Sequence, residues 1–236
     1  MPEKIFKTLI KSEGYKLASS RWYPLDIPQY KSAIIMYGNS DDVPRLKSNF
    51  AYSMQYIQYV EKQLYELKLS DVIITMLYKS YIITSMSIIE ALFSNLLHRT
   101  NNWNTTTWQE FSDIVSNPKK LDGVNIRIET RLFKEVDKYE MRMDLDSMIK
   151  RIEKKRLLSI DHSAFPALKK LRELRNRVHL QIGVGPYDHD YNCFGFEEMQ
   201  MMRRILYTIL TSAEFCNNAK AFEFIKNAYI ENGGVL

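Results

Sequence analysis

The sequence predicts an all-α protein, a bundle of four to five main helices preceded by an N-terminal extension over residues 1–45. Two observations carry this prediction. The 236 residues include only 8 Gly and 7 Pro, which is few for a β protein with many turns. After residue 45, apolar residues recur at intervals of three and four, as on the buried face of a helix. Residues 46–236 are therefore assigned to one helical domain.

The N-terminal extension has a mixed or irregular pattern. A short helix is expected near Ile5–Ile10, and prolines with clustered turn residues follow it. The apolar run Ala33–Tyr37 suggests a short strand. We expect this segment to pack on the helical domain.

Two long helices open the helical domain. Residues 46–68 place apolar side chains at helical spacing, namely Phe50, Met54, Ile57, Val60, Leu64 and Leu67. Ser70 suits an N-cap, and a second helix is expected from Asp71 to His98. This helix is apolar around most of its circumference, so it should lie at the centre of the fold. Charged residues interrupt its apolar run, which argues against a membrane span.

The later elements are read from caps and periodicity. Thr107 is expected to cap a short helix ending near Val115, and residues 116–133 are ambiguous, with turn signals before a short β-like alternation. Ser163 caps a helix with Pro166 in its first turn that should run to about His179. Three further helical segments are expected at about Asp146–Leu158, Phe196–Cys216 and Ala219–Ala228.

The charge is modest overall but unevenly placed. The chain carries a net +5, whereas residues 150–177 alone contain ten Lys or Arg against three acids, a net +7. A basic segment of this kind can attract RNA, and a solvated helical face explains it equally well. Two cysteines and a charged start predict a cytoplasmic protein with no membrane role.

The stretch LRELRNRVHL, residues 171–180, is the candidate site. On a helix its aliphatic residues form one apolar stripe. The border between this stripe and the exposed face holds four polar residues at spacings that let their side chains converge, namely Arg172, Arg175, Asn176 and His179. Such residues can be desolvated and still be reached by a ligand. An ordinary solvated helix is the competing interpretation.

These residue types fit the cleavage of RNA without a metal. RNA carries its own nucleophile, the 2′-OH beside each phosphodiester. His179 can accept that proton or protonate the departing 5′-oxygen. Arg175 can hold the phosphate as negative charge builds, and Asn176 can orient the imidazole or the phosphate.

RELRNRVHL, together with the upstream helix SYIITSMSIIEALFSNLL, resembles the HEPN superfamily (higher eukaryotes and prokaryotes nucleotide-binding). The resemblance covers roughly residues 46–216. It makes Arg175 the signature arginine, Asn176 the polar residue after it and His179 the histidine. Three residues separate Arg175 from His179 instead of the usual four to six, whereas six separate Arg172 from His179. Arg175 with Asn176 is the favoured pair, and Arg172 in the arginine role is the alternative.

The resemblance implies a helical bundle, usually dimeric, in which two copies of the motif form one RNA-cleaving cleft. The expected function is that of a metal-independent endoribonuclease of a defence or toxin–antitoxin system, with no cofactor. The expected partners are RNA, a second copy of the chain and an antitoxin such as a nucleotidyltransferase-like protein. An inactive HEPN-like module that binds RNA, nucleotide or a partner protein is the alternative, and a helical scaffold is a third.

Two further features bear on the site. Glu90 is an acid within the most apolar helix, and a buried carboxylate needs a partner, so it either pairs with Arg175 or Arg172 or points out of the bundle. His189 lies between Asp188 and Asp190 and could cover the RNA cleft or join a metal site. Simple solvation is the favoured interpretation of that loop.

Overall fold

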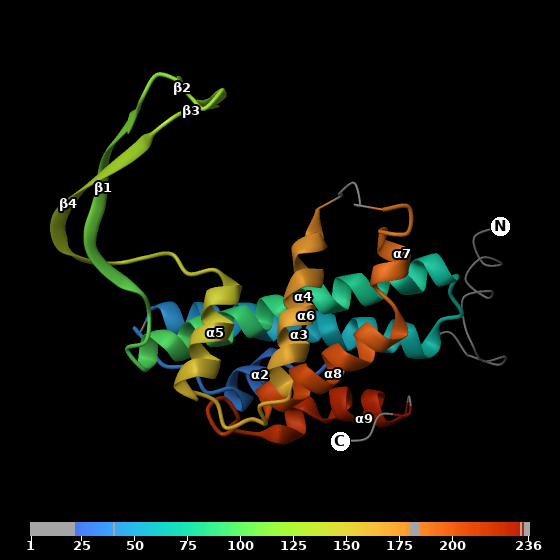
Figure 1. Cartoon of the computed structure of the whole chain (residues 1–236). Coiled ribbons are helices and arrows are strands. Elements are labelled where there is room, and N and C mark those ends of the chain that lie inside the picture. Colours follow the sequence, from blue (N-terminus) through green and yellow to red (C-terminus); the bar gives the residue numbers. More distant parts are fainter. Residues whose placement is uncertain (1–21, 40, 180–184, 232, 234–236) are drawn as a thin grey trace.

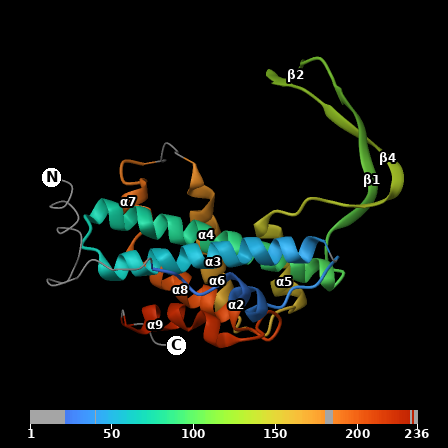
Figure 2. The same cartoon turned by 180° about the vertical axis from the view of Figure 1, so that it is seen from behind.

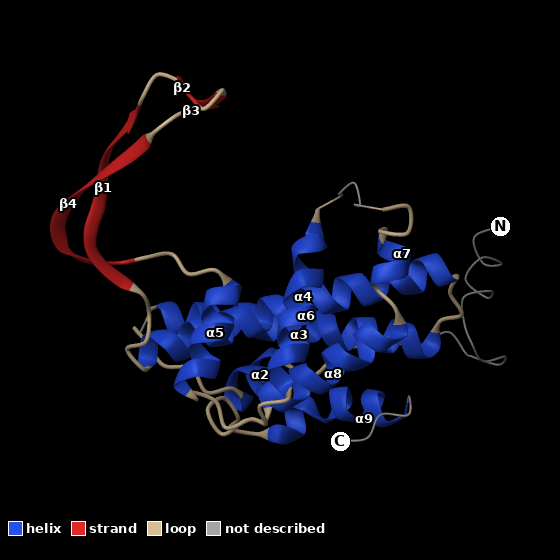
Figure 3. Cartoon of the chain, viewed as in Figure 1, coloured by secondary structure: helices blue, strands red, loops and turns tan. Residues whose placement is uncertain are grey.

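A bundle of helices carries a long antiparallel β-hairpin in the computed structural model (Figures 1 and 3). The structure describes residues 22–39, 41–179, 185–231 and 233. Within these residues there are eight α-helices and four strands, so the prediction of an all-α fold is wrong and the chain is mixed α and β.

The error arose in the segment expected to form a helix capped by Thr107. It forms strand β1, Thr105–Val115, which pairs antiparallel with β4, Glu129–Glu140. β1 reads TTTWQEFSDIV and is rich in β-branched and aromatic residues, which favour a strand. The ambiguous residues between these strands form a second small hairpin of β2, Lys119–Leu121, and β3, Val124–Ile126. We call Thr105–Glu140 the arm.

The turn at the tip of the arm was recognisable in the sequence. Asp122 and Gly123 join β2 to β3, and both have positive φ, at 49° and 80°. An Asp-Gly pair between two short strands is a strong hairpin signal because both central residues of such a turn need left-handed backbone.

The described part of the N-terminal extension joins the core. α2, Ile27–Ala33, starts at Asp26 with a proline in its first turn and buries Tyr30 and Ala33 completely. Ile34 makes an isolated antiparallel bridge with Cys216, which is the described structure nearest to the strand expected at Ala33–Tyr37. The helix expected at Ile5–Ile10 lies outside the described residues.

The two long helices confirm the periodicity of their sequence. α3 spans Asp42–Glu66 and α4 spans Asp71–Arg99. α4 contacts α3, α5, α6, α7 and α8, so it occupies the expected central place (Figures 1 and 2). By length and composition alone α4 could cross a membrane, a property that buried core helices share, and 44% of its most apolar window is buried.

The remaining helices close the bundle around α4. They are α5 (Leu145–Lys155), α6 (Ala164–Arg175), α7 (Asp190–Cys193), α8 (Phe196–Leu210) and α9 (Glu223–Glu231), with short 3₁₀ turns η1 (Asn176–Val178) and η2 (Ala219–Phe222). The helix expected to reach His179 therefore ends at Arg175, and the one expected to reach Cys216 ends at Leu210. α6 tightens into η1, as helices often do at their C-termini.

A buried ion pair links α3 to α8 inside the bundle. Arg203 donates two hydrogen bonds to the carboxylate of Glu61, at 2.8 and 2.6 Å, and its side chain is 4% exposed. Tyr81 lies against this pair in the core, where burial raises the pKa of its hydroxyl well above the usual value. Charges this deep persist because each is paired and hydrogen-bonded.

Candidate functional site

Arg175 is in the last turn of α6 and meets a carboxylate from the central helix. Its guanidinium Nη2 lies 2.6 Å from Oε2 of Glu90 in α4, and both side chains are about one-third exposed (34% and 28%). Of the three alternatives for Glu90, namely a pair with Arg175, a pair with Arg172 or a position outside the bundle, the structure shows the pair with Arg175. The ion pair fixes one edge of the guanidinium and leaves the side chain partly open to solvent.

Arg172 turns toward α5, another helix that packs against α6. Its Nε lies 3.4 Å from Oδ1 of Asp146 at the start of α5, and its Nη2 lies 3.5 Å from Glu173. Its Nε is buried and has no hydrogen bond of good geometry. Arg172 and Arg175 therefore have different carboxylate partners, one on α5 and the other on α4.

His179 does not lie one helical turn above Arg175. Arg177 in η1 departs from helical backbone, with ψ of 21°, and His179 is extended, with φ −87° and ψ 154°. The expected stacking of His179 on Arg175 along a continuous α-helix is therefore wrong. Asn176 and His179 are both exposed, so the imidazole stays accessible to a ligand.

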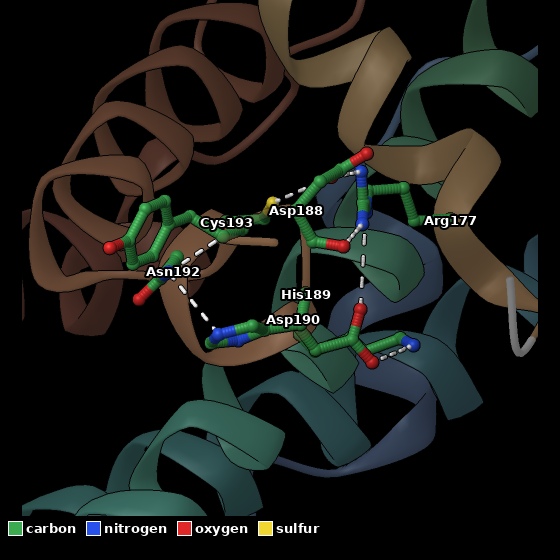
Figure 4. Close-up of polar contacts among 8 residues, drawn as sticks. Arg177, Asp188, His189, Asp190, Asn192 and Cys193 are labelled. Carbon is green, nitrogen blue, oxygen red and sulfur yellow. Dashed lines mark hydrogen bonds and ion pairs between the residues drawn. The ribbon is translucent and has the colours of Figure 1, made fainter. Parts of the chain in front are cut away.

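On a continuous α-helix Arg177 would face solvent, but the structure ties it to the loop before α7 (Figure 4). Its Nη1 donates to Oδ1 of Asp188 at 2.6 Å, and its side chain is only 20% exposed. The hydrogen bond from Arg177 to Asp188 raises the pKa of the guanidinium. Arg177 therefore holds residues 185–190 close to the end of α6.

A second ion pair anchors the same loop to the central helix. Lys79 of α4 has a side chain only 9% exposed, and its Nζ lies 2.7 Å from Oδ2 of Asp190. The ammonium also lies 5.6 Å from the ring centre of Phe194. Asp190 stands 3.9 Å from Arg177 as well, so it links the two cations. Burial of Lys79 needs this partner, because an unpaired buried charge is costly.

His189 and Cys193 lie at the edge of this cluster. The Nε2 of His189 is 3.3 Å from the amide of Asn192, and the ring is exposed. The thiol of Cys193 lies 3.7 Å from Asp188, and burial raises its pKa, which makes it a poor nucleophile. Asp188 and Asp190 are thus bound to cations of the protein, which explains the YDHDY sequence as a structural latch. We call Arg177, Asp188, Asp190 and Lys79 the latch.

No cluster of three or more His, Cys, Asp or Glu side chains in the described part of the chain is arranged to hold a metal ion. The groups at the end of α6 that can act on a ligand are the open edge of Arg175, the exposed Asn176 and the exposed imidazole of His179. Their chemistry is anion binding by a fixed guanidinium and proton transfer by a histidine.

Sequence reasoning missed the latch. Arg177 followed the helical pattern of a solvated face, and Lys79 was seen only as an interruption of an apolar helix. The available signal was the pair of aspartates in a short loop directly after a basic helix, because opposite charges close in the chain often pair.

Comparisons with known proteins give no relative. No family model, no curated protein and no solved structure matches this chain.

Proposed function

We propose that this protein is a metal-independent endoribonuclease of a defence or toxin–antitoxin system. One observation carries the proposal. The partly exposed guanidinium of Arg175 is held by the carboxylate of Glu90 at 2.6 Å and stands four residues before the exposed imidazole of His179. The resemblance of RELRNRVHL to the HEPN motif supports the same assignment. RNA, a second copy of the chain and an antitoxin are the proposed partners, and the cytoplasm is the proposed location.

In this proposal Arg175 binds the scissile phosphate and offsets the charge that develops on its oxygens. Glu90 is a positioning residue, because it holds the guanidinium in one orientation. His179 takes the proton of the 2′-OH or supplies one to the 5′-oxygen, and Asn176 orients the phosphate, whereas Arg172 is turned to Asp146. The 2′-oxygen attacks phosphorus and the P–O5′ bond breaks, so the products are a 2′,3′-cyclic phosphate and a free 5′-hydroxyl.

A catalytically inactive module that binds RNA, nucleotide or a partner protein is the second candidate. One observation favours it, namely that His179 stands outside the α-helix and is not aligned over Arg175. A second copy of the motif, facing the first, is what would bring a histidine and an arginine together in the active form.

The test compares the unaltered chain with His179→Ala on labelled RNA in excess EDTA. We expect the unaltered chain to leave 2′,3′-cyclic phosphate ends and His179→Ala to lose at least about a hundredfold in rate, the usual contribution of general acid–base catalysis. His162→Ala is the matched control, since His162 lies at the opposite end of α6 from the motif and its side chain is 80% exposed.

Three outcomes separate the candidates. Cleavage that His179→Ala abolishes and His162→Ala preserves supports the nuclease. RNA binding without cleavage by all three proteins supports the inactive module. Equal cleavage by all three proteins contradicts the assigned role of His179.

A further inference from the structure

The arm has almost no support from the body of the protein. Its longer strand has 12 residues, so it reaches roughly 40 Å. The strands pair with each other, and none of them packs along a described helix. Figures 1 and 2 both show it standing away from the bundle, on the side where the end of α6 also projects. A two-stranded hairpin alone is marginally stable in water.

The arm also exposes far more apolar surface than a solvated hairpin should. Eleven large apolar side chains between Thr105 and Glu140 are exposed, among them Trp108 (54%), Phe111 (68%) and Phe133 (52%). An exposed apolar surface of this extent marks a protein contact. Both outer edges of the two-stranded sheet are also free of backbone partners among the described residues.

The base of the arm is firmly held, so it can present this surface in one direction. Trp103 donates its indole N–H to the carbonyl of Met141 at 2.9 Å across the two chains of the base. The ring of His98 stacks on Trp103 with centres 4.1 Å apart, and the same imidazole meets Glu140 at 3.4 Å. Arm and bundle are therefore joined by a packed aromatic contact and by the polar contact of His98 with Glu140.

The charge of the arm disfavours RNA as its partner. Its two long strands carry six acids and three basic residues, a net −3. A polyanion would be repelled along this length, and aliphatic side chains such as Ile114 and Leu132 gain nothing from a phosphate backbone. A protein with a cationic surface is the better fit.

The same chain carries such a surface. Lys154, Lys155 and Arg156 follow one another at the C-terminal end of α5, and all three are exposed. Most other cations of the basic segment are ion-paired within the chain, as Lys169 is with Glu153, whereas no ion pair with a described residue involves these three. Outside the arm the chain has a net +6. Each molecule therefore carries acidic strands on its arm and a cationic surface at the end of α5. Its own arm points away from the bundle and does not cover that surface (Figure 1).

We propose that the arm clasps a second copy of this chain, its acidic strands lying against Lys154, Lys155 and Arg156 of that copy. Because each copy supplies one arm and one cationic surface, the contact is made twice about a two-fold axis. The dimer itself does not depend on the nuclease activity proposed above. If that activity exists, the clasp brings a second α6 end to the side of the bundle where the first projects.

A charge exchange tests the clasp with the full-length chain, by light scattering over a range of concentrations. We expect the unaltered chain to dimerise. Lys154→Glu with Lys155→Glu, or Glu135→Lys with Asp137→Lys, should raise the dissociation constant of the dimer at least about tenfold, since each substituted pair removes attraction in two symmetric contacts and adds repulsion. An equimolar mixture of the two variants, or one chain carrying all four changes, should recover the dimer.

The control is Lys68→Glu with Lys220→Glu, which makes the same change of charge at exposed positions outside α5 and the arm. Thermal melting verifies that every variant is folded. A parent chain that stays monomeric overturns the proposal, and so does a dimer that both charge reversals leave intact, in which case the arm serves a different protein. RNA cleavage measured on the same samples reports separately on the nuclease, since dimerisation and cleavage are independent readouts.

Discussion

At the scale of single residues, three charged pairs tie the helices of the bundle to one another. Arg203 pairs with Glu61, Lys79 with Asp190, and Arg175 with Glu90, each linking elements far apart in the chain. The Arg203–Glu61 pair is the most buried. If either charge were removed, water could not reach the other to solvate it. The Arg175–Glu90 pair lies nearer the surface and leaves about one-third of the Arg175 side chain exposed to a ligand.

We expect Glu61→Gln to lower the free energy of unfolding by about 3–5 kcal/mol, because it leaves the Arg203 guanidinium charged and buried without its counter-ion. Urea denaturation measures this change. Glu66→Gln on the same helix is the matched control. Glu66 pairs with Lys62 at the surface, and its loss should cost less than about 1 kcal/mol. Equal effects of the two substitutions would contradict the buried-pair argument.

At the scale of elements, helix α5 depends on a titratable N-cap. The carboxylate of Asp144 accepts a hydrogen bond from the backbone N–H of Ser147 at 2.8 Å, and hydrogen bonds from Ser147 lower the pKa of Asp144 below its usual 3.8. A carboxyl with a lowered pKa in the folded state stabilises it above the unfolded-state pKa. That contribution is lost as the pH falls through the folded-state value.

Asp144→Ala should therefore cost about 1 kcal/mol of stability at neutral pH, the usual value of an N-cap. The difference from the parent should shrink below about pH 4, where the parent carboxyl becomes protonated. Denaturation at a series of pH values measures it. Asp144→Asn keeps an oxygen cap that does not titrate, so its stability relative to Asp144→Ala should not depend on pH in this range.

The arm is the element whose local conformation can be changed without touching the bundle. Gly123 has φ of +80°, and a Cβ there would meet no atom within 4 Å, so only backbone strain opposes a side chain. Gly123→Ala should cost the tip of the arm roughly 1–2 kcal/mol. Amide hydrogen exchange should speed up in β2 and β3 while global unfolding is unchanged. Gly185→Ala is the control, because its φ lies outside the left-handed region and a Cβ there would also meet open space.

At the scale of the whole molecule, the positive charge lies on the body, whereas the arm is nearly neutral and only its two long strands are acidic. The body carries a net +6 and the arm a net −1, so a polyanion should approach the bundle and avoid the arm. Within the basic segment most cations are neutralised by neighbours, which leaves few to bind phosphate. The number of phosphate contacts should therefore be small.

Arg175→Ala should weaken RNA binding at every sequence and lower the slope of log K against log salt by about one, the signature of one lost phosphate contact. Fluorescence anisotropy with labelled RNA over a range of salt concentrations measures both quantities. Lys68→Ala, an exposed cation at the far end of α3, should leave the slope unchanged. An unchanged slope for Arg175→Ala would remove this arginine from the proposed interface.

The sequence by itself determined the long helices, because burial of one face imposes a helical period that local residues display, as Phe50, Met54 and Ile57 do in α3. For Glu90 the sequence left open whether the carboxylate pairs with Arg175, pairs with Arg172 or points out of the bundle. Only the tertiary structure decided for Arg175, ended α6 before His179 and built the latch from Lys79 and Asp190, 111 residues apart. Most of the arm escaped prediction because its strands bury neither face, so only the short alternation and the turn signals within residues 116–133 mark it in the sequence.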